Sequence, residues 1–504
     1  MKRISLILLI LASIVAMPLT AGGDKEAQST EKVIRVADQA ANLITPGVWG
    51  GQALSMNSSI YEYFVDINAE TGKLDPVLAT EWSTEDGTTW TFKLRKGVTF
   101  HDGSNFTSAD AKYSIERTQD LSIGHLKRED FSIVELIETP DEHTIIVHLT
   151  ESRPTFVYQF TDYNMAMLSS EYDYAKLGES NPMGTGPFIL SQYIPRESAI
   201  LEKNPSYWNP ELPKVDKLII YFVADIEASI SMLEDGRVDV VPDINSISIR
   251  RLTNRDGISV YSPSLEHRFV AMNVDEKPWD DNRVRLAFKY SIDPQILVKS
   301  VTQLDLGQGT EYNETPILNM QAEYKERPLR GRNLEKSKAL LAQAGYPNGV
   351  KVELYYALDH PFQKELAQAL KELSAPAGFD LDLKGFPRNI YLSQYWLKVP
   401  MSITAWGGRA DPSMLLTLVF RGGGVWNETH MDNPRVNTLI DQIRSTINEE
   451  KKLEYYHELQ EVFYEEGAIL NVQVPYLVGI SDRIIDYRQP MAMLPQYKYT
   501  DILP

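Results

Sequence analysis

The first third of the chain is patterned for β-strands. In the segment TTWTFKLRKGVTF, the apolar residues Trp90, Phe92 and Leu94 alternate with polar ones, which is the period of a strand with one buried face. Residues 143–149 (HTIIVHL) alternate in the same way. Residues 108–117 begin at a Thr/Ser cap and predict a short helix. We therefore expect a β-rich region early in the chain.

From about residue 320 the pattern changes to alternating helices and strands. Asn333 is a good N-cap for an apolar helical stripe that stops at Gly345. The alternation continues with predicted strands at 350–356, 379–383 and 401–405, and predicted helices at 362–373, 436–443 and 453–463. This order is typical of the α/β class, in which helices flank a sheet.

One loop of this region combines three chemically different side chains. It follows the predicted strand 401–405 and reads WGGRADP, with Trp406, Arg409 and Asp411 in a glycine-rich setting. Ligands of open α/β sheets bind beyond the carboxyl ends of the strands. The loop is therefore a candidate functional site.

The N-terminus has the layout of a secretory signal. Lys2 and Arg3 precede an apolar run at 4–17, and Pro18 and small residues follow it. The run is shorter than the ~20 residues of a transmembrane helix. We predict a cleaved signal peptide over residues 1–23 and a mature protein in the periplasm. An uncleaved N-terminal anchor is the alternative.

Composition narrows the function classes. The 504 residues suggest two to four domains. The net charge of -19 argues against a partner nucleic acid, because such proteins present basic patches to phosphates. Cysteine is absent, which excludes disulfides, thiolate metal sites and a lipid-modified N-terminal cysteine. The absence of a lipid anchor favours the periplasm over a cell surface.

The sequence carries no motif for catalysis. Its eight histidines form no HExxH or other dense metal spacing, and no GxSxG, GxxxxGK[ST] or GxGxxG is present. Carboxylates are abundant and none stands out, so a glycosidase pair stays open. We expect no catalytic residues, no cofactor and no metal site, and we predict that the protein is not an enzyme.

Five segments in a fixed order carry a family resemblance. They are LATEWSTEDGTTWTFKLRKGVTFHDGSNFTSADAKYSIER (78–117), NPMGTGPFIL (181–190), NPSYW (204–208), DDNRVRLAFKYSID (280–293) and LLAQAGYPNG (340–349). The chain resembles the family 5 solute-binding proteins of ABC importers, which include periplasmic dipeptide- and oligopeptide-binding proteins.

The resemblance implies a fold. It is the two-lobed periplasmic binding protein fold of class II type, with an extra β-rich subdomain in the first lobe. Lobe I would comprise residues 31–268 and 475–504, with the subdomain at about 50–182. Lobe II would comprise residues 269–474.

The resemblance also implies a function and partners. The protein would capture a short peptide, or a related small amino/carboxylate solute, between its lobes. It would deliver this solute to an inner-membrane ABC permease complex. We expect it to act as a monomer.

Two loop residues are the principal site predictions. Asp411 occupies the "DP" position at which peptide-binding family members hold the peptide α-ammonium; the alternative is that it only caps a helix. Arg409 would clamp a carboxylate, or would pair with Asp411 and position it. The form WGGRADP looks closer to members that take glutathione or short peptides.

Further predicted ligand contacts lie on neighbouring segments. They are Trp406, Trp426, Asn427, Arg388, Tyr391 and Trp49.

Other functions stay open at this point. The same fold binds oligosaccharides, opines or nickel chelates in other family members, and His430 would be the imidazole for a nickel chelate. A secreted hydrolase, a chemoreceptor partner and a periplasmic chaperone are alternatives of other classes.

Overall fold

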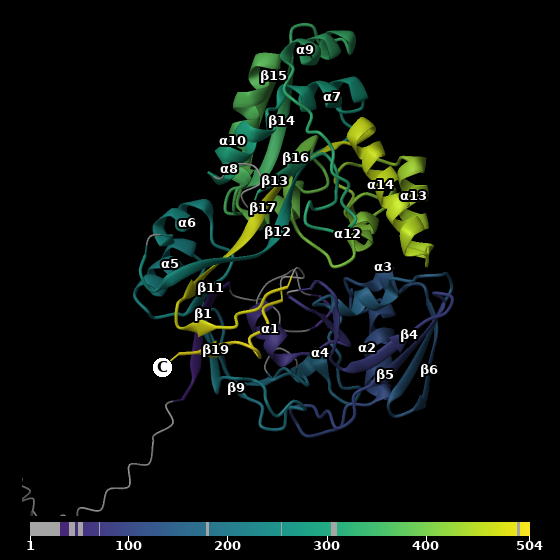
Figure 1. The fold of residues 1–504 in the computed structure, drawn as a ribbon, viewed down its shortest axis with the longest axis vertical. Coiled ribbons are helices and arrows are strands. Elements are labelled where there is room, and N and C mark those ends of the chain that lie inside the picture. Colours follow the sequence, from purple (N-terminus) through teal and green to yellow (C-terminus); the bar gives the residue numbers. More distant parts are fainter. Residues whose placement is uncertain are drawn as a thin grey trace, which may run out of the picture. The chain divides into compact units, whose positions relative to one another are not determined.

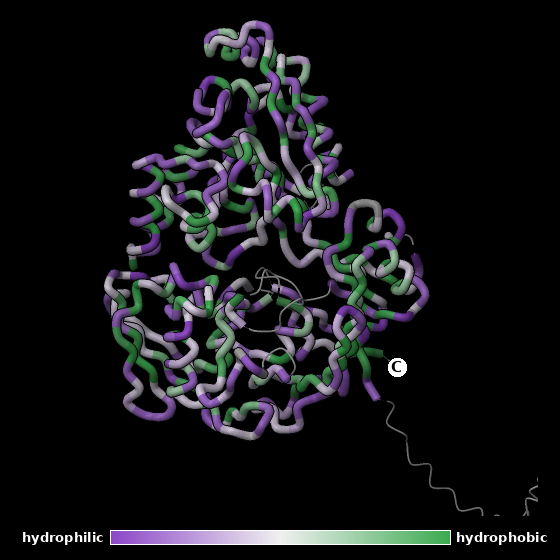
Figure 2. The backbone as a smooth tube through the Cα atoms, turned by 180° about the vertical axis from the view of Figure 1, so that it is seen from behind, coloured by the Kyte–Doolittle hydropathy of each residue, from purple (hydrophilic) through white to green (hydrophobic). Residues whose placement is uncertain are grey.

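In the computed structural model, the helices and strands lie within Lys32–Pro504. It describes residues 31–39, 46–48, 54–69, 71–177, 181–253, 255–303, 310–490 and 494–503. The predicted signal peptide and Trp49 lie outside the described residues. Within them, no helix combines the length and the apolar content needed to cross a membrane. The coloured tube in Figure 2 accordingly changes between apolar and polar every few residues.

The main sheet has eleven strands in the described part of the chain (Figure 1). Their order is β15-β14-β16-β12-β17-β11-β1-β10-β9-β8, and β13 pairs with β17 outside this path. In chain order they are β1 (Val33–Asp38), β8 (Phe188–Ile194), β9 (Ser198–Lys203), β10 (Lys217–Phe222), β11 (Val240–Val241), β12 (Ile258–Met272), β13 (Glu311–Asn313), β14 (Val350–Ala357), β15 (Phe379–Phe386), β16 (Met401–Gly407) and β17 (Ile469–Ser481).

Two long strands connect the halves of this sheet. β12 has 15 residues and β17 has 13, and they pair antiparallel along almost their whole length. β16 pairs with β12 only from Glu266 onward, and β11 reaches β17 only at Gly479 and Ile480. Among the described strands, residues 261–265 and 475–478 therefore pair only with each other; we call this part the ribbon. The register shifts inside it, between Tyr261 and Ser264.

The early β-rich region is confirmed. An antiparallel sheet, β4-β5-β7-β6, contains both predicted strands, and Trp90, Phe92 and Leu94 are buried on one face of β5. The predicted helix is α2, and Asp110 accepts a hydrogen bond from the N–H of its N-cap Thr107 at 2.8 Å. Elements of this region are α1 (Leu54–Ile60), β2 (Val65–Ile67), β3 (Leu74–Pro76), β4 (Ala79–Ser83), β5 (Thr89–Leu94), α2 (Ser108–Glu116), α3 (Arg128–Phe131), β6 (Val134–Asp141), β7 (Thr144–Leu149) and α4 (Tyr174–Leu177).

The later α/β alternation is also confirmed. The three predicted strands are β14, β15 and β16, and β14 pairs in parallel with both of the others. Asn333 caps α9 by accepting from the N–H of Lys336 at 2.9 Å. Helices of this region and of the preceding segment are α5 (Ile226–Glu234), α6 (Ser246–Leu252), α7 (Asn282–Ser291), α8 (Pro294–Thr302), α9 (Leu334–Gln343), α10 (Gln363–Ser374), α11 (Arg388–Ile390), α12 (Pro412–Val419), α13 (Pro434–Ser445) and α14 (Glu449–Glu466). The chain closes with β18 (Ile484–Ile485) and β19 (Asp501–Ile502), which pair with each other.

The apolar side chains form three clusters. The first joins residues 34–222 to residues 476–502. The second contains the helices around β14 and β15, and also residues of α5 and α6. The third lies among α12, α13 and α14. The predicted lobe boundaries stay a prediction, and α5 and α6 pack with the second cluster although they precede residue 269.

Candidate functional site

A cavity of about 470 Å³ lies where strands from both halves of the main sheet end. β1 and β10 are parallel and end side by side at Asp38 and Phe222. Asp38 lines the cavity, as do residues 358–362, which directly follow β14. The carboxyl ends of parallel strands are where α/β sheets place ligands. Other described residues in the lining are Asp225, Asp243, Asn245, Glu266, Lys364, Glu365, Arg388, Tyr476 and Gln489.

The lining is rich in carboxylates. Among the described lining residues, six are Asp or Glu and two, Lys364 and Arg388, are cationic. Burial raises the pKa of Asp243 to about 6, and the charges of Glu266 and Asp38 act in the same direction. Burial also raises the pKa of Asp38. Burial is the main cause of both shifts, and the six carboxyl groups around one cavity suit a cationic group.

Basic side chains lie beside these carboxylates. Glu266 forms an ion pair of 2.9 Å with Arg268, and both side chains are buried. His360 lines the cavity, and burial together with the charges of Arg268 and Arg388 holds its pKa well below the usual value. His360 is therefore a neutral imidazole at neutral pH. No described carboxylate lies within 4.0 Å of the Arg388 guanidinium, so it can receive an anionic group.

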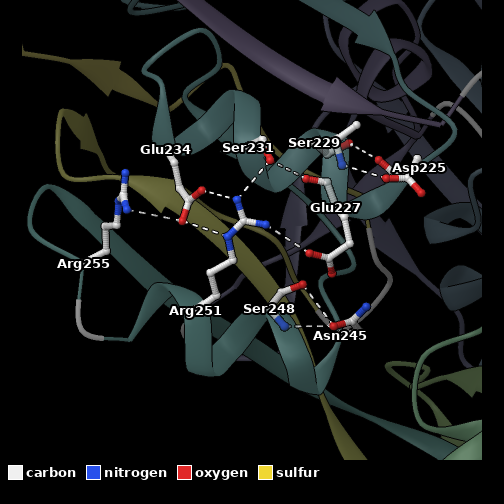
Figure 3. A network of polar contacts seen from close by, with 10 residues as sticks. Asp225, Glu227, Ser229, Ser231, Glu234, Asn245, Ser248, Arg251 and Arg255 are labelled. Carbon is white, nitrogen blue, oxygen red and sulfur yellow. Dashed lines mark hydrogen bonds and ion pairs between the residues drawn. The ribbon is translucent and has the colours of Figure 1, made fainter.

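Polar contacts join α5 and α6 beside the cavity. Figure 3 shows Arg251 of α6 reaching Glu227 and Glu234 of α5; the Nε–Oε1 distance to Glu234 is 2.9 Å. Asp225 caps α5, and Asn245 accepts from the N–H of Ser248 at 2.9 Å. Asp225 and Asn245 also line the cavity, so these two caps hold the helix starts beside it, while the ion pairs of Arg251 join the helices at exposed positions.

Asp411 caps a helix. It is the N-cap of α12, and its Oδ1 accepts from the N–H of Ser413 at 2.7 Å and from the hydroxyl of Tyr456 at 3.0 Å. The residue is 4% exposed and is not among the described residues of the cavity lining. Asp411 thus caps a helix, which was one of the two roles that the sequence left open. A ligand contact of Asp411 stays a prediction.

Arg409 faces the first half of the chain. Its Nη1 donates to the carbonyls of Gly407 and Gly408 at 3.3 and 3.4 Å, and no ion pair with Asp411 within 4.0 Å is found among the described residues. Burial raises the pKa of Asp162, but the charges of Lys127 and Arg409 outweigh this and lower it. Arg409 thus acts on Asp162 and is not the ion-pair partner of Asp411.

The two predicted tryptophans lie side by side. The ring centroids of Trp406 and Trp426 are 5.5 Å apart, and Trp396, which the sequence analysis did not select, lies 6.2 and 6.1 Å from them. We call these three residues the tryptophan cluster. All three are half-buried, and none is among the described residues of the cavity lining.

Of the other predicted contacts, one lines the cavity and the rest make contacts within the protein. Arg388 lines the cavity. Asn427 shapes its own turn by donating to the carbonyl of Met431 at 3.0 Å, and Tyr391 is 1% exposed. Both nitrogens of His430 are engaged, by Asp275 at 2.9 Å and by the Leu397 carbonyl at 3.0 Å.

The cavity acids and His360 were missed as site residues. The available signal was their position: Asp38 ends one strand and His360 follows another. In the described part of the chain, no group of three or more His, Asp or Glu is arranged to hold a metal ion.

This architecture defines the class of protein. The structure resembles the periplasmic binding protein DppA from Helicobacter pylori in complex with the peptide STSA, with a TM-score of 0.81 and 21% identity over 94% of this chain and 98% of that one. It also resembles NikZ from Campylobacter jejuni in complex with Ni(L-His), with a TM-score of 0.81 and 20% identity over 93% and 97%. The fold is therefore that of the two-lobed periplasmic binding proteins, as predicted.

The family follows from the sequence comparison. The family model of bacterial extracellular solute-binding proteins, family 5, matches residues 73–427, and the chain belongs to this family. It is similar to the glutathione-binding protein GsiB of Escherichia coli K12, with 28% identity over 439 residues and 84% of each chain covered. These relatives are solute-binding proteins, and the resemblance seen in the sequence is confirmed.

Proposed function

We propose that the protein is the periplasmic solute-binding component of an ABC importer. It captures a short peptide, or a related small solute with amino and carboxylate groups, and delivers it to an inner-membrane permease complex. It performs no chemistry on the solute and acts as a monomer. The observation that carries the proposal is the cavity of about 470 Å³ whose walls come from both halves of the chain.

The origin of these walls supports capture by closure. Asp38 and Arg388 both line the cavity, so a solute that fills it would contact residues from both halves of the chain. It therefore favours the arrangement that brings the two sides together. The proposed lobe boundaries lie close to the ribbon. Lobe I comprises residues 31–268 and 475–504, and lobe II comprises residues 269–474.

The charges of the cavity support a solute with both an amine and a carboxylate. The six carboxyl groups of the lining can bind an ammonium group, and the guanidinium of Arg388 can bind a carboxylate with two parallel hydrogen bonds. Asp243 is then a second candidate for the ammonium, beside Asp411. The glutathione-binding relative and the peptide-bound neighbour are named for solutes of this kind.

A nickel chelate is the second candidate. His360 presents a neutral imidazole in the cavity lining, and a neutral imidazole is a good nickel ligand. The neighbour with bound Ni(L-His) shares the fold. In this version of the proposal His360 replaces His430 as the ligand of the metal cargo.

Native mass spectrometry of gently purified mature protein tests the proposal first. Calorimetry with glutathione, the dipeptide Met-Leu and Ni(L-His) follows. A co-purified peptide-like mass and tight binding of glutathione or Met-Leu support the proposal. Tight binding of Ni(L-His) alone supports the second candidate. Hydrolysis of Met-Leu by the purified protein would establish the enzyme alternative.

A further inference from the structure

The six carboxyl groups of the described cavity lining differ in the partners that they already have. Asp225 is the N-cap of α5, and Oδ1 of Asp359 accepts from the N–H of Arg388 at 2.7 Å. Glu266 is paired with the buried guanidinium of Arg268 at 2.9 Å. A solute that binds one of these three groups therefore has to share or displace a contact that stabilises the protein.

The other three groups are Asp38, Glu365 and Asp243. The carboxyl group of Asp38 accepts hydrogen bonds from Gln39 and Ser55. Glu365 lies in the first turn of α10, where the unpaired N–H groups of a helix start stabilise a negative charge. Asp243 has neither kind of support, because among the described residues no group donates a hydrogen bond to its carboxyl or forms an ion pair with it. It is the carboxyl group of the lining that a cationic partner would stabilise most.

The backbone holds the carboxyl group of Asp243 in a fixed place. Asp243 has a φ of 55°, in the left-handed region that Asp and Asn tolerate better than other non-glycine residues. The N–H of Ile244 donates to the carbonyl of Leu477 at 3.0 Å, and Asn245 caps the start of α6 (Figure 3). A binding group that is already held in place pays little ordering entropy when a ligand reaches it.

We propose that Asp243 binds the ammonium group of the solute, so that the cavity selects solutes with a free amino group. The inference rests on the proposed function and names the residue that recognises one end of the solute. Asp411, the other candidate, already accepts two hydrogen bonds with its Oδ1 and is not among the described residues of the lining. Arg388, which lines the same cavity, is left for the carboxylate end.

The charges around Asp243 give the proposal a signature in pH. Four charged groups face it from neighbouring elements, namely Glu266 and Arg268 of β12, Asp38 of β1 and Arg388 of α11. Burial raises the pKa of Asp243 to about 6; the two acids act in the same direction and the two arginines oppose them. An ammonium group favours the ionised carboxyl, so protonation of Asp243 competes with solute binding. With a pKa of about 6, the ionised fraction falls about tenfold between pH 7 and pH 5.

Other titratable groups near Asp243 are common to the wild type and its variants. Burial raises the pKa of Tyr476 well above 10, so this group stays neutral. Burial and the nearby arginines hold the pKa of His360 well below its usual value, and burial raises the pKa of Asp38. The difference between the pH profiles of the wild type and Asp243→Asn therefore reports Asp243.

Calorimetry of Met-Leu binding at pH 5, 6 and 7 tests the inference. Asparagine keeps an oxygen in the same place and tolerates the same φ, so Asp243→Asn should fold, which urea unfolding checks. We expect the wild-type Kd to rise about tenfold from pH 7 to pH 5. Asp243→Asn should weaken binding roughly 30-fold or more at pH 7 and should lose this pH dependence.

Two controls separate ammonium recognition from a general effect on the cavity. N-acetyl-Met-Leu has no ammonium group, so its binding should not weaken in Asp243→Asn. Glu365→Gln is the matched variant, because Glu365 is the other carboxyl group of the described lining without an ion-pair partner among the described residues. Its affinity for Met-Leu should stay within about threefold of the wild type.

The outcomes distinguish this inference from the proposed function. Wild-type affinity for Met-Leu in Asp243→Asn overturns the inference and leaves the proposed function intact. A loss in Glu365→Gln that Asp243→Asn does not show, an equal loss for N-acetyl-Met-Leu, or the same pH profile in both proteins also overturns it. Failure of the wild type to bind either Met-Leu or glutathione removes the proposed function, and the inference falls with it.

Discussion

Replacement of Asp411 separates its two roles, the helix cap and the predicted ammonium contact. Asp411→Ala removes the cap of α12, which costs about 1 kcal/mol, and leaves the buried Tyr456 hydroxyl without its acceptor, which costs about 1–3 kcal/mol. We expect the free energy of unfolding to fall by roughly 2–4 kcal/mol. Asp411→Asn keeps an oxygen in the same place and removes only the charge. It should cost less than about 1 kcal/mol.

The predicted ammonium contact gives a different expectation for binding. Removing one partner of a buried ion pair costs about 3–5 kcal/mol, which corresponds to roughly two to four orders of magnitude in Kd. If Asp411 holds the ammonium, Asp411→Asn weakens binding of Met-Leu by this amount while the fold stays intact. N-acetyl-Met-Leu lacks the ammonium, so its affinity should be the same in both proteins.

Urea unfolding and calorimetry on the same preparations provide both numbers. Wild-type affinity for Met-Leu in Asp411→Asn would refute the ammonium contact and leave Asp411 as a cap alone. A loss that appears in Asp243→Asn instead would place the ammonium in the cavity. A stable Asp411→Ala protein would refute the cap energetics.

Three further predictions concern the cavity and its wall. Arg388→Ala should weaken binding of free Met-Leu roughly 10- to 100-fold, and should have little effect on its C-terminal amide, as measured by calorimetry. The raised pKa of Asp243 means that the folded state binds more protons than the unfolded state between about pH 4 and 6, so this group lowers stability as pH rises through that range. Asp243→Asn should therefore increase the free energy of unfolding at pH 7 and make its pH dependence flatter, and an unchanged urea profile would contradict this. Arg251→Ala breaks an exposed ion-pair network and should change stability by less than about 1 kcal/mol, with solute affinity unaffected.

The local elements could be predicted because their patterns are local. Trp90, Phe92 and Leu94 alternate within one strand, and Asn333 caps its own helix, so both were visible along the chain. The long strands β12 and β17 were not predicted. β17 is buried along Ile469–Gly479, including the polar residues Asn471 and Gln473, so both of its faces are covered and it lacks the half-exposed pattern of the strands that were predicted.

The site could be predicted only in part because it is assembled from distant segments. Asp38, Asp243, His360 and Arg388 meet at one cavity although they lie far apart along the chain, and only the stretch 359–365 contributes several charged residues to it. Of the residues predicted from the sequence, Arg388 lines this cavity, and its contact with a solute stays a prediction. For Asp411 it offered two roles for one motif, since an Asp-Pro pair is both a good helix start and a good place for a charge.

The ribbon determines how the molecule can deform. Two strands that pair only with each other twist more easily than strands inside a wide sheet, while their shared ladder resists stretching. Beside the ladder, the N–H of Ile244 donates to the carbonyl of Leu477 in the ribbon at 3.0 Å. The register shifts between Tyr261 and Ser264, and Pro263 has no N–H to donate to the ladder. The strand pair should therefore twist most easily at these few residues. We therefore expect any motion of one half relative to the other to be a rotation near Tyr476, a residue that both belongs to the ribbon and lines the cavity. An occupant of the cavity would lie beside this point of rotation, so we expect its size to set the angle between the two halves.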